Sequence, residues 1–403
     1  MYKESVKKVK EMLKIKLIPA EYGDCIWISI EDKKNINILI DGGTSKTYQK
    51  FIKKEIVNIE ELGQKLDLII CTHMDYDHIG GLIQTIMNTD SEKIGSVWYN
   101  GFLQVINSRY YTKPENQYSD LDNIILDEII TRGTQYGGEQ KIGINHGMAL
   151  GTLLQEKNIL VNSITGGNTI STEFINKSAK IAEHTELTIL GPSKESLQAL
   201  ENFWKREMVA RNYTFQVSNT LKLMEAFEYQ LEAIQLFYSE EIKISRLEEL
   251  ERYMGDLDEV DGSVTNASSI SFIIQHNKEK YLFLGDAIID KTLLQNIEQI
   301  VGREYRFKAI KLPHHGSRYN ITHEFIQRYQ ADEYYCLTNS KRFGHPDLEV
   351  LASIICHDAS YKRIFFNYPI EKAYFLDNKN WKKKYNFDIV IGTDESPIER
   401  NFE

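Results

Sequence analysis

The sequence predicts an α/β protein arranged as a four-layer αββα sandwich. Short β-rich runs alternate with helical stretches along the chain, and these runs fall into two groups. Two sheets that each bury one face against the other need helices to cover their outer faces. The chain has 403 residues, of which 42% are hydrophobic and 26% are charged, so it can form one large domain or two ordinary ones.

Three β-rich runs begin the first half of the predicted sandwich, at residues 1–192. They are "KLIPAEYGDCIWISIE", "NINILIDGG" and "LDLIICTH", and the first pair turns near Lys33 to Asn35. The third run is followed by the helix-like stretch "GGLIQTIMNT".

A later series of β-rich runs predicts the second sheet. It consists of "ELTILGPS", "SSISFIIQHNKEKYLFLGDA", "FKAIKLPHHGS", "EYYCLTNS" and "KRIFFNY". Helical patterns such as "DKTLLQNIEQIVG" and "THEFIQRYQ" lie between these runs. Residues 261–403 are therefore expected to form the C-terminal half of the same sandwich domain.

Residues 193–260 break this rhythm and predict a helical insertion. Stretches such as "LMEAFEYQLEAIQLFY" have apolar residues at helical spacing and many carboxylates. Acidic-apolar helices of this kind more often serve as scaffold or partner surface than as catalytic elements. We therefore expect a protein partner, if there is one, to bind through residues 193–260, and the sequence leaves the oligomeric state open.

The formal net charge of −10 argues against broad electrostatic attraction to nucleic acid, because such binding needs clustered Lys and Arg. No window approaches eighteen consecutive apolar residues, so no contact with a membrane is expected. The lysine-rich start lacks the apolar core of a signal peptide, and the four cysteines show no paired spacing. These features predict a cytoplasmic protein without disulfides.

The stretch "CTHMDYDHIGG" places His73, Asp75, Asp77 and His78 close together, directly after the apolar run "LDLII". Carboxylates at that spacing repel one another unless a cation lies between them, and neutral imidazoles are good metal ligands. On a loop at a strand end, His73 and Asp75 would point to one side, whereas Asp77 and His78 could reach a second ion. The sequence therefore predicts a dinuclear metal site.

This stretch resembles the metallo-β-lactamase superfamily signature H-x-H-x-D-H, with Asp75 in place of the second histidine. With the Gly-Gly that follows, it is similar to the hydrolase domain of ComEC-type competence proteins and their stand-alone relatives. Further stretches resemble that subgroup and occur in its order: "AEYGDCIWI", "ILIDGG", "LFLGDA" and "KLPHHGS". The resemblance spans residues 14 to about 350 and implies the metallo-β-lactamase fold.

The resemblance also implies further metal ligands. Asp286 closes the run "YLFLGD" and is expected to bridge two cations, since it stands at a strand end. Of His314 and His315, one is expected to be a ligand and the other to face the substrate. His146 is the candidate for the histidine that the superfamily usually places before the bridging aspartate.

Asp77, His314 and His315 are thus the expected catalytic residues. His345, in a Gly-His-Pro sequence similar to one in the subgroup, and Ser317 are expected to contact the substrate.

A charge count indicates the metal and the reaction. The carboxylates of Asp75, Asp77 and Asp286 supply −3 against +4 from two divalent ions, and a bridging hydroxide brings the total to about zero. Asp75 in place of a histidine makes the site harder, which favours Mn²⁺ relative to Zn²⁺ without excluding zinc. Such an ion pair suits phosphoester hydrolysis.

We therefore expect the protein to be a phosphodiesterase, and in particular a nuclease acting on DNA or RNA, as the resemblance implies. Stand-alone relatives also resemble effectors of bacterial anti-phage systems. Two alternatives stay open. The acidic charge favours an esterase for a small phosphorylated or acyl substrate, and the helical segment would suit a metal-stabilised interaction scaffold.

Overall fold

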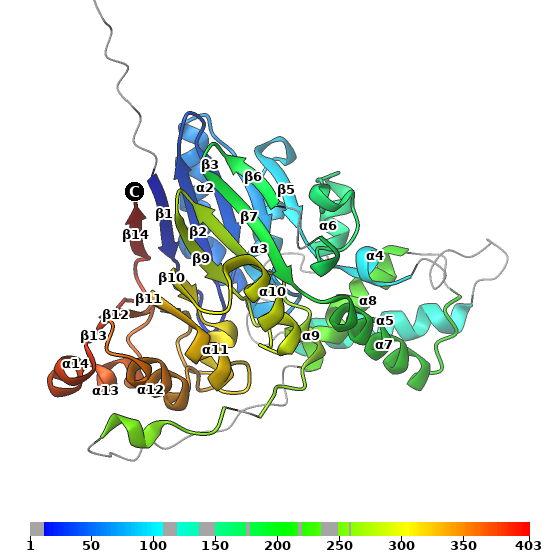
Figure 1. Ribbon diagram of the computed structural model, residues 1–403. Coiled ribbons are helices and arrows are strands. Elements are labelled where there is room, and N and C mark those ends of the chain that lie inside the picture. The colour runs from blue at the N-terminus through cyan, green and yellow to red at the C-terminus, as the bar shows by residue number, and fades with distance from the viewer. Residues whose placement is uncertain are drawn as a thin grey trace, which may run out of the picture.

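Two sheets lie face to face in the computed structural model, which describes residues 12–107, 119–136, 150–174, 178–216, 220–234, 249–257 and 259–403 (Figure 1). Within these residues the first sheet has, in spatial order, β14 (Ile398–Phe402), β1 (Met12–Leu17), β2 (Ile26–Glu31), β3 (Ile36–Ile40), β4 (Leu66–Ile70) and β5 (Ile94–Trp98). The second has β13 (Phe387–Ile391), β12 (Lys362–Phe366), β11 (Tyr329–Cys336), β10 (Tyr305–Lys311), β9 (Glu279–Phe283), β8 (Ser271–His276), β7 (Thr185–Gly191) and β6 (Ser178–Ala182).

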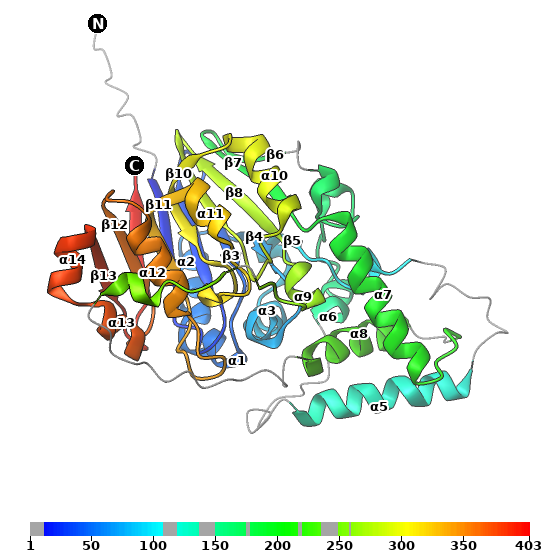
Figure 2. The same cartoon turned by 60° about the horizontal axis from the view of Figure 1, so that its bottom comes forward.

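Helices cover the outer faces of both sheets (Figures 1 and 2). They are α1 (Ser45–Thr47), α2 (Lys53–Glu61), α3 (Tyr76–Asn88), α4 (Phe102–Val105), α5 (Asp120–Tyr136), α6 (Leu150–Glu156), α7 (Lys194–Ala210), α8 (Thr220–Ile234), α9 (Val264–Ala267), α10 (Lys291–Val301), α11 (His323–Arg328), α12 (Leu348–His357), α13 (Glu371–Leu376) and α14 (Lys379–Tyr385). The predicted αββα sandwich is confirmed. In the described part of the chain, no helix combines the length and the apolar character needed to cross a membrane.

Three apolar cores separate the four layers. The central core lies between the sheets, where residues such as Ile15, Ile28, Phe272 and Tyr281 are 0% exposed. β1 reaches this core with every second residue, as the period of a half-buried strand requires. The other two cores lie between each sheet and its own helices.

The helices α7 and α8 lie within the segment 193–260 that was predicted as an insertion. Their apolar faces pack inside the protein, where Trp204 is 5.3 Å from the ring of Phe102 and 5.9 Å from that of Phe227, measured between centroids. Figure 2 shows α5, α7 and α8 grouped at the opposite side of the molecule from α12, α13 and α14. Residues 217–219, 235–248 and 258 of the segment lie outside the described residues.

The first predicted strand proved to be two. "KLIPAEYGDCIWISIE" contains the end of β1 and all of β2, because Glu21 (φ 62°) and Gly23 turn the chain between them. An added Cβ at Gly23 would lie 1.8 Å from the carbonyl oxygen of Asp77, so only glycine lets this turn approach the start of α3.

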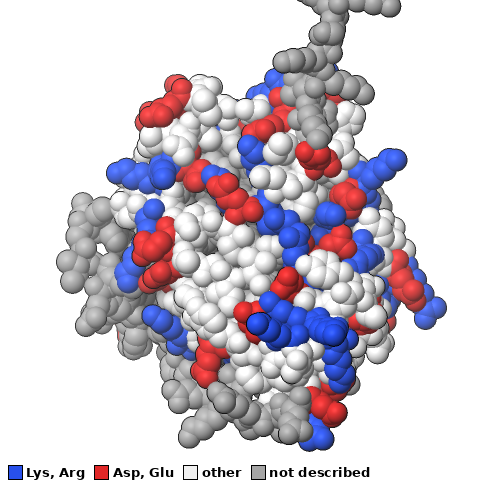
Figure 3. Space-filling view, turned by 90° about the vertical axis from the view of Figure 1, so that its left-hand side faces the viewer, with Lys and Arg blue, Asp and Glu red and all other residues white. Residues whose placement is uncertain are grey.

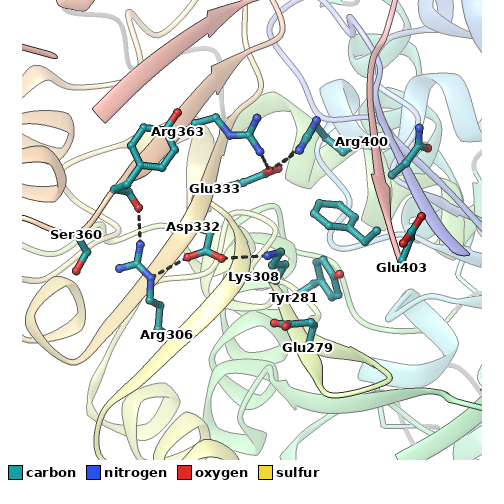
Figure 4. Close-up of a pocket in the computed structure, with 13 residues that line it drawn as sticks. Glu279, Tyr281, Arg306, Lys308, Asp332, Glu333, Ser360, Arg363, Arg400 and Glu403 are labelled. Atoms are coloured by element: carbon teal, nitrogen blue, oxygen red, sulfur yellow. Dashed lines mark hydrogen bonds and ion pairs between the residues drawn. The ribbon is translucent and has the colours of Figure 1, made fainter. Parts of the chain in front are cut away.

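An ionic cluster joins the two sheets where β11, β12 and β14 meet (Figure 4). The buried Glu333 of β11 accepts hydrogen bonds from Arg363 of β12 at 2.5 Å and from Arg400 of β14 at 2.6 and 2.9 Å. A cavity of about 730 Å³ lies beside it, where Arg306 also pairs with Asp332. Figure 3, which looks at the left-hand side of Figure 1, shows positive and negative side chains interspersed over that face. These ion pairs therefore hold β14 against the second sheet.

Candidate metal centre

The loop after β4 and the start of α3 carry the first four predicted ligands. His73 and Asp75 lie on the loop. Asp77 and His78 lie in the first turn of α3, so their predicted placement on the loop was wrong. The helix can begin before them because first-turn N–H groups need no partner within the helix, and a carboxylate there is favoured by the helix dipole. Loop and helix thus bring all four side chains to one buried place.

Asp286 follows β9 and lies among four imidazoles. It is 1% exposed. The distances from its Oδ2 to Nε2 are 3.4 Å for His78, 3.7 Å for His315, 3.8 Å for His73 and 3.9 Å for His314. One carboxylate oxygen facing four ring nitrogens is the arrangement expected of a residue that bridges two cations.

Each of these imidazoles uses Nδ1 for a contact within the protein. The partners are Thr72 Oγ1 for His73 (3.1 Å), Asp41 Oδ2 for His78 (2.9 Å), Asn320 Oδ1 for His314 (2.9 Å) and Leu337 O for His315 (2.7 Å). Carbonyl and carboxylate oxygens can only accept, so His78 and His315 carry a proton on Nδ1. This is the pattern by which proteins fix metal-ligating histidines with Nε2 toward the metal.

The ring nitrogens and carboxylate oxygens of this site are better arranged to bind a cation than to form hydrogen bonds with one another. Nε2 of His78 and of His315 is buried and makes no hydrogen bond, and the nearest acidic oxygens are those of Asp286 and Asp77. A ring lone pair that faces a carboxylate oxygen in a buried space is repulsive unless a cation or a proton lies between them. Four groups of three described residues have donor atoms within 4.8 Å of one another. They are His73, His78 and Asp286; Asp77, His78 and His315; Asp24, Asp286 and His315; and Asp24, Asp41 and His78.

The pKa values show how strongly the centre attracts positive charge. Burial lowers the pKa of His315, but the carboxylates of Asp286 and Asp24 outweigh it and raise the pKa to about 9. Burial raises the pKa of Asp77, yet the neighbouring imidazoles of His315 and His78 bring it to about 2. Metal ions satisfy the same charges by displacing such protons. Nitrogen and carboxylate donors together suit Zn²⁺, Mn²⁺ or iron.

Asp41 was missed as a site residue by the sequence reasoning, although its run "ILIDGG" was noted. It follows β3, and its Oδ2 accepts from both His78 Nδ1 (2.9 Å) and Thr72 Oγ1 (2.7 Å). Its Oδ1 accepts from Thr72 N at 2.8 Å. The sequence did contain a signal for Asp41: an aspartate directly after an apolar strand, in a chain that also carries a metal motif.

Asp24 and Lys311 were also missed. Both are buried, and they form an ion pair with each other. Lys311 Nζ also lies 3.5 Å from Asp286 Oδ1, and Asp24 Oδ1 lies 3.1 Å from His315 Nδ1. The pair therefore lies next to both Asp286 and His315. Only the "GD" of the first predicted strand hinted at Asp24.

The turn after β10 aims His314 and His315 at the same carboxylate. Both residues have left-handed backbone, with φ values of 44° and 55°. The side chain of His315 is 1% exposed, whereas that of His314 is 16% exposed. His315 also belongs to a candidate ligand set with Asp77 and His78. The geometry thus places His315 inside the centre and His314 at its open side.

The two predicted substrate residues lie at different depths. The side chain of His345 is 12% exposed, its ring is 5.0 Å from that of His314, and its Nδ1 is 3.3 Å from Asp347 Oδ2. Ser317 is buried, and its Oγ accepts a hydrogen bond from Tyr319 N. His345 therefore stands beside the open edge of the centre, and Ser317 lies under the turn. His146 lies outside the described residues.

Comparison with known proteins gives a family model and distant structural likenesses. The model described as "Metallo-beta-lactamase superfamily" matches residues 19–84, which include Asp41 and all four predicted ligands of the first motif. No curated protein matches the chain. The matched segment and the two-sheet architecture together give the metallo-β-lactamase fold, as the sequence predicted.

The solved structures with similar folds share little sequence. The metallo-beta-lactamase fold protein YhfI from Bacillus subtilis has 9% identity, with 98% of this chain and 100% of that chain covered at a TM-score of 0.40. Zn²⁺-bound PqqB from Methylobacterium extorquens has 9% identity, with 97% and 99% covered at a TM-score of 0.37. A diphosphatase from the PhnP family has 10% identity, with 98% of each chain covered at a TM-score of 0.36. Similarity at this level says nothing of substrate.

Proposed function

We propose that this protein is a dinuclear metal-dependent phosphodiesterase, and that its substrate is a strand of DNA or RNA. The observation that carries the proposal is the position of Asp286, whose Oδ2 lies within 3.9 Å of Nε2 of four imidazoles. Two divalent cations bound there would polarise a phosphoryl oxygen and lower the pKa of a water molecule.

The chain's own residues hold this chemistry in place. Asp41 orients His78, and Asp24 with the carbonyl of Leu337 orients His315. His314 and His345 stand at the open side, where their rings would contact the phosphoryl oxygens of a bound diester. Asp75, in place of a histidine, makes the donor set richer in oxygen, so we expect Mn²⁺ to support activity at least as well as Zn²⁺.

Metal loading and hydrolysis test the proposal together. The wild-type chain, loaded with Mn²⁺ or Zn²⁺, should contain near two ions by elemental analysis and hydrolyse bis-p-nitrophenyl phosphate and single-stranded DNA or RNA. Asp286→Asn should lose both ions and turnover, because the amide is neutral and keeps only one of the two acceptor oxygens. Asp67→Asn is a matched control, since Asp67 is a half-buried carboxylate of β4 that contacts Asn37 N and Lys34 instead.

A small-substrate esterase is the second candidate, favoured by the net charge of −10. That charge opposes broad attraction of a nucleic-acid backbone. A fully metallated wild type that hydrolyses p-nitrophenyl acetate or a lactone, but no phosphodiester, would support the esterase and contradict the phosphodiesterase.

A role as an effector in bacterial anti-phage defence is a further part of the proposal and rests on resemblance alone. It predicts that expression of the wild type, but not of Asp286→Asn, lowers phage plating efficiency. Equal plating on both strains would contradict it.

A further inference from the structure

A loop between β11 and α12 brings Arg342 and Phe343 beside the candidate metal centre. The ring of Phe343 is 6.2 Å from that of His314 and 6.3 Å from that of His345. The loop is fixed at its ends, because Ser340 Oγ donates to the carbonyl of His345 at 2.6 Å and Lys372 Nζ donates to that of Pro346 at 2.8 Å. Arg342 therefore occupies a defined place at the open side.

The guanidinium of Arg342 is held by aromatic rings. Its Cζ lies 4.7 Å from the ring centroid of Tyr22 and 5.0 Å from that of Phe343. Among the described residues, no carboxylate forms an ion pair with this half-buried guanidinium. By contrast, the nearby Arg318 lies 3.7 Å from a carboxylate oxygen of Glu349.

This difference matters because a carboxylate partner would cancel the charge of the guanidinium. Aromatic faces attract a cation through their quadrupole and leave its net charge in place. Tyr22 and Phe343 thus fix the position of Arg342 while its full positive charge and its N–H donors stay available to a ligand.

With two divalent cations bound, the centre would have no positive charge to spare for a second anionic group. Its five buried carboxylates would be balanced by Lys311 and the two cations; these carboxylates belong to Asp24, Asp41, Asp75, Asp77 and Asp286. A substrate with one phosphate at the centre and another beside it therefore needs a separate cation for the second phosphate. Arg342 is such a cation.

We propose that Arg342 binds the phosphate next to the scissile phosphodiester and so selects a nucleic-acid strand over a substrate with a single phosphate. This inference rests on the proposed phosphodiesterase function. Tyr22 and Phe343 are positioning residues that act through Arg342.

Three thymidine dinucleotides test the inference. TpT has only the scissile phosphate, whereas pTpT and TpTp carry one more phosphate on the 5′ or the 3′ side. For the wild type, one of the two extended dinucleotides should have a higher kcat/KM than TpT. In Arg342→Ala this preference should fall by about tenfold to a hundredfold, mainly through KM, because charge-assisted hydrogen bonds to one phosphate are lost.

A salt titration adds a measurement whose result would not change in the variant if Arg342 had only a structural role. On a longer single-stranded oligonucleotide, the slope of log KM against log salt concentration should decrease by about 0.7 in Arg342→Ala, as expected for one lost phosphate contact. Arg342→Lys should keep the slope, since it keeps the charge. Arg252→Ala is the control, because it also removes one charge but lies exposed beside Glu249.

The outcomes separate the inference from the proposed function. If the wild type cleaves these dinucleotides and a fully metallated Arg342→Ala keeps both the wild-type preference and the salt slope, the inference is overturned and the phosphodiesterase stands. A wild type that shows no preference for either extended dinucleotide also overturns it. A metallated wild type that cleaves no phosphodiester overturns both.

Discussion

Replacing Asp41 by asparagine tests whether the ring of His78 is oriented for metal binding. Asp41 Oδ2 accepts from both His78 Nδ1 and Thr72 Oγ1, and its Oδ1 accepts from Thr72 N. Asparagine keeps one acceptor oxygen and replaces the other by an NH₂ donor. One of these contacts must therefore be lost in the variant.

Either orientation of the amide weakens the centre. With its oxygen toward Thr72 N, the NH₂ group meets His78 Nδ1 and favours the tautomer with a proton on Nε2, the atom that faces Asp286. With its oxygen toward His78, the NH₂ group opposes the Thr72 N–H. Partners of ligating histidines typically contribute 10–100-fold to metal affinity, so we expect a loss of about 1.4–2.7 kcal/mol in the free energy of metal binding.

Competition with a chromophoric chelator measures this loss for Mn²⁺ and Zn²⁺. Asp67→Asn serves again as the control, and thermal unfolding of the metal-free proteins shows whether each variant is folded. A folded Asp41→Asn that binds both ions with wild-type affinity would refute the assignment of Asp41 as the partner that orients His78.

Three further predictions concern packing, pH and the sheet edge. In Gly23→Ala the added methyl group would displace the backbone at Asp77. Calorimetry should therefore show weaker metal binding and a lower Tm. An unchanged metal affinity would contradict the close approach of Gly23 to Asp77. Burial raises the pKa of Glu228 above its usual 4.5, so its proton stabilises the folded state below that pH, and this stability is lost as pH rises through the raised value. Thermal melts of wild type and Glu228→Gln should therefore diverge as the pH rises above 4.5, and parallel curves would count against this. Arg400→Ala leaves the buried Glu333 with Arg363 as its one guanidinium partner among the described residues. The variant should lose about 1–3 kcal/mol in the free energy of unfolding, measured with urea. A loss below about 0.5 kcal/mol would show that the pairing is dispensable.

The fold was predictable where hydrophobic periodicity is strong and hidden where it is weak. The runs that became β4, β9 and β10 are apolar and end in a polar cluster, so their type was clear from local sequence. By contrast, β5 ("IGSVW"), β6 ("SAKIA"), β13 ("FDIVI") and β14 ("IERNF") were not predicted. They are short, they contain small or charged residues, and they are strands because a neighbour pairs with them.

The candidate site was predictable to the extent that its candidate ligands are close in sequence or stand at strand ends. His73 to His78 form a local pattern, and Asp286 and the histidine pair stand at ends of apolar runs. The contacts of Asp41, Asp24 and Lys311 join strands far apart in the chain, so no local pattern shows them. Asp41 can orient His78, and Asp24 can orient His315, only because the fold brings the two residues of each pair together.

The pairing of β1 with β14 has a consequence for biosynthesis. Leu13 pairs with Phe402, so the edge of β1 stays unpaired until residues 398–402 have left the ribosome. An unpaired strand edge is a template for strands of other molecules, and nascent chains with such edges tend to aggregate. Emergence of β14, followed by pairing of Arg400 with Glu333, would then cover the edge of β1 and tie β14 to the second sheet.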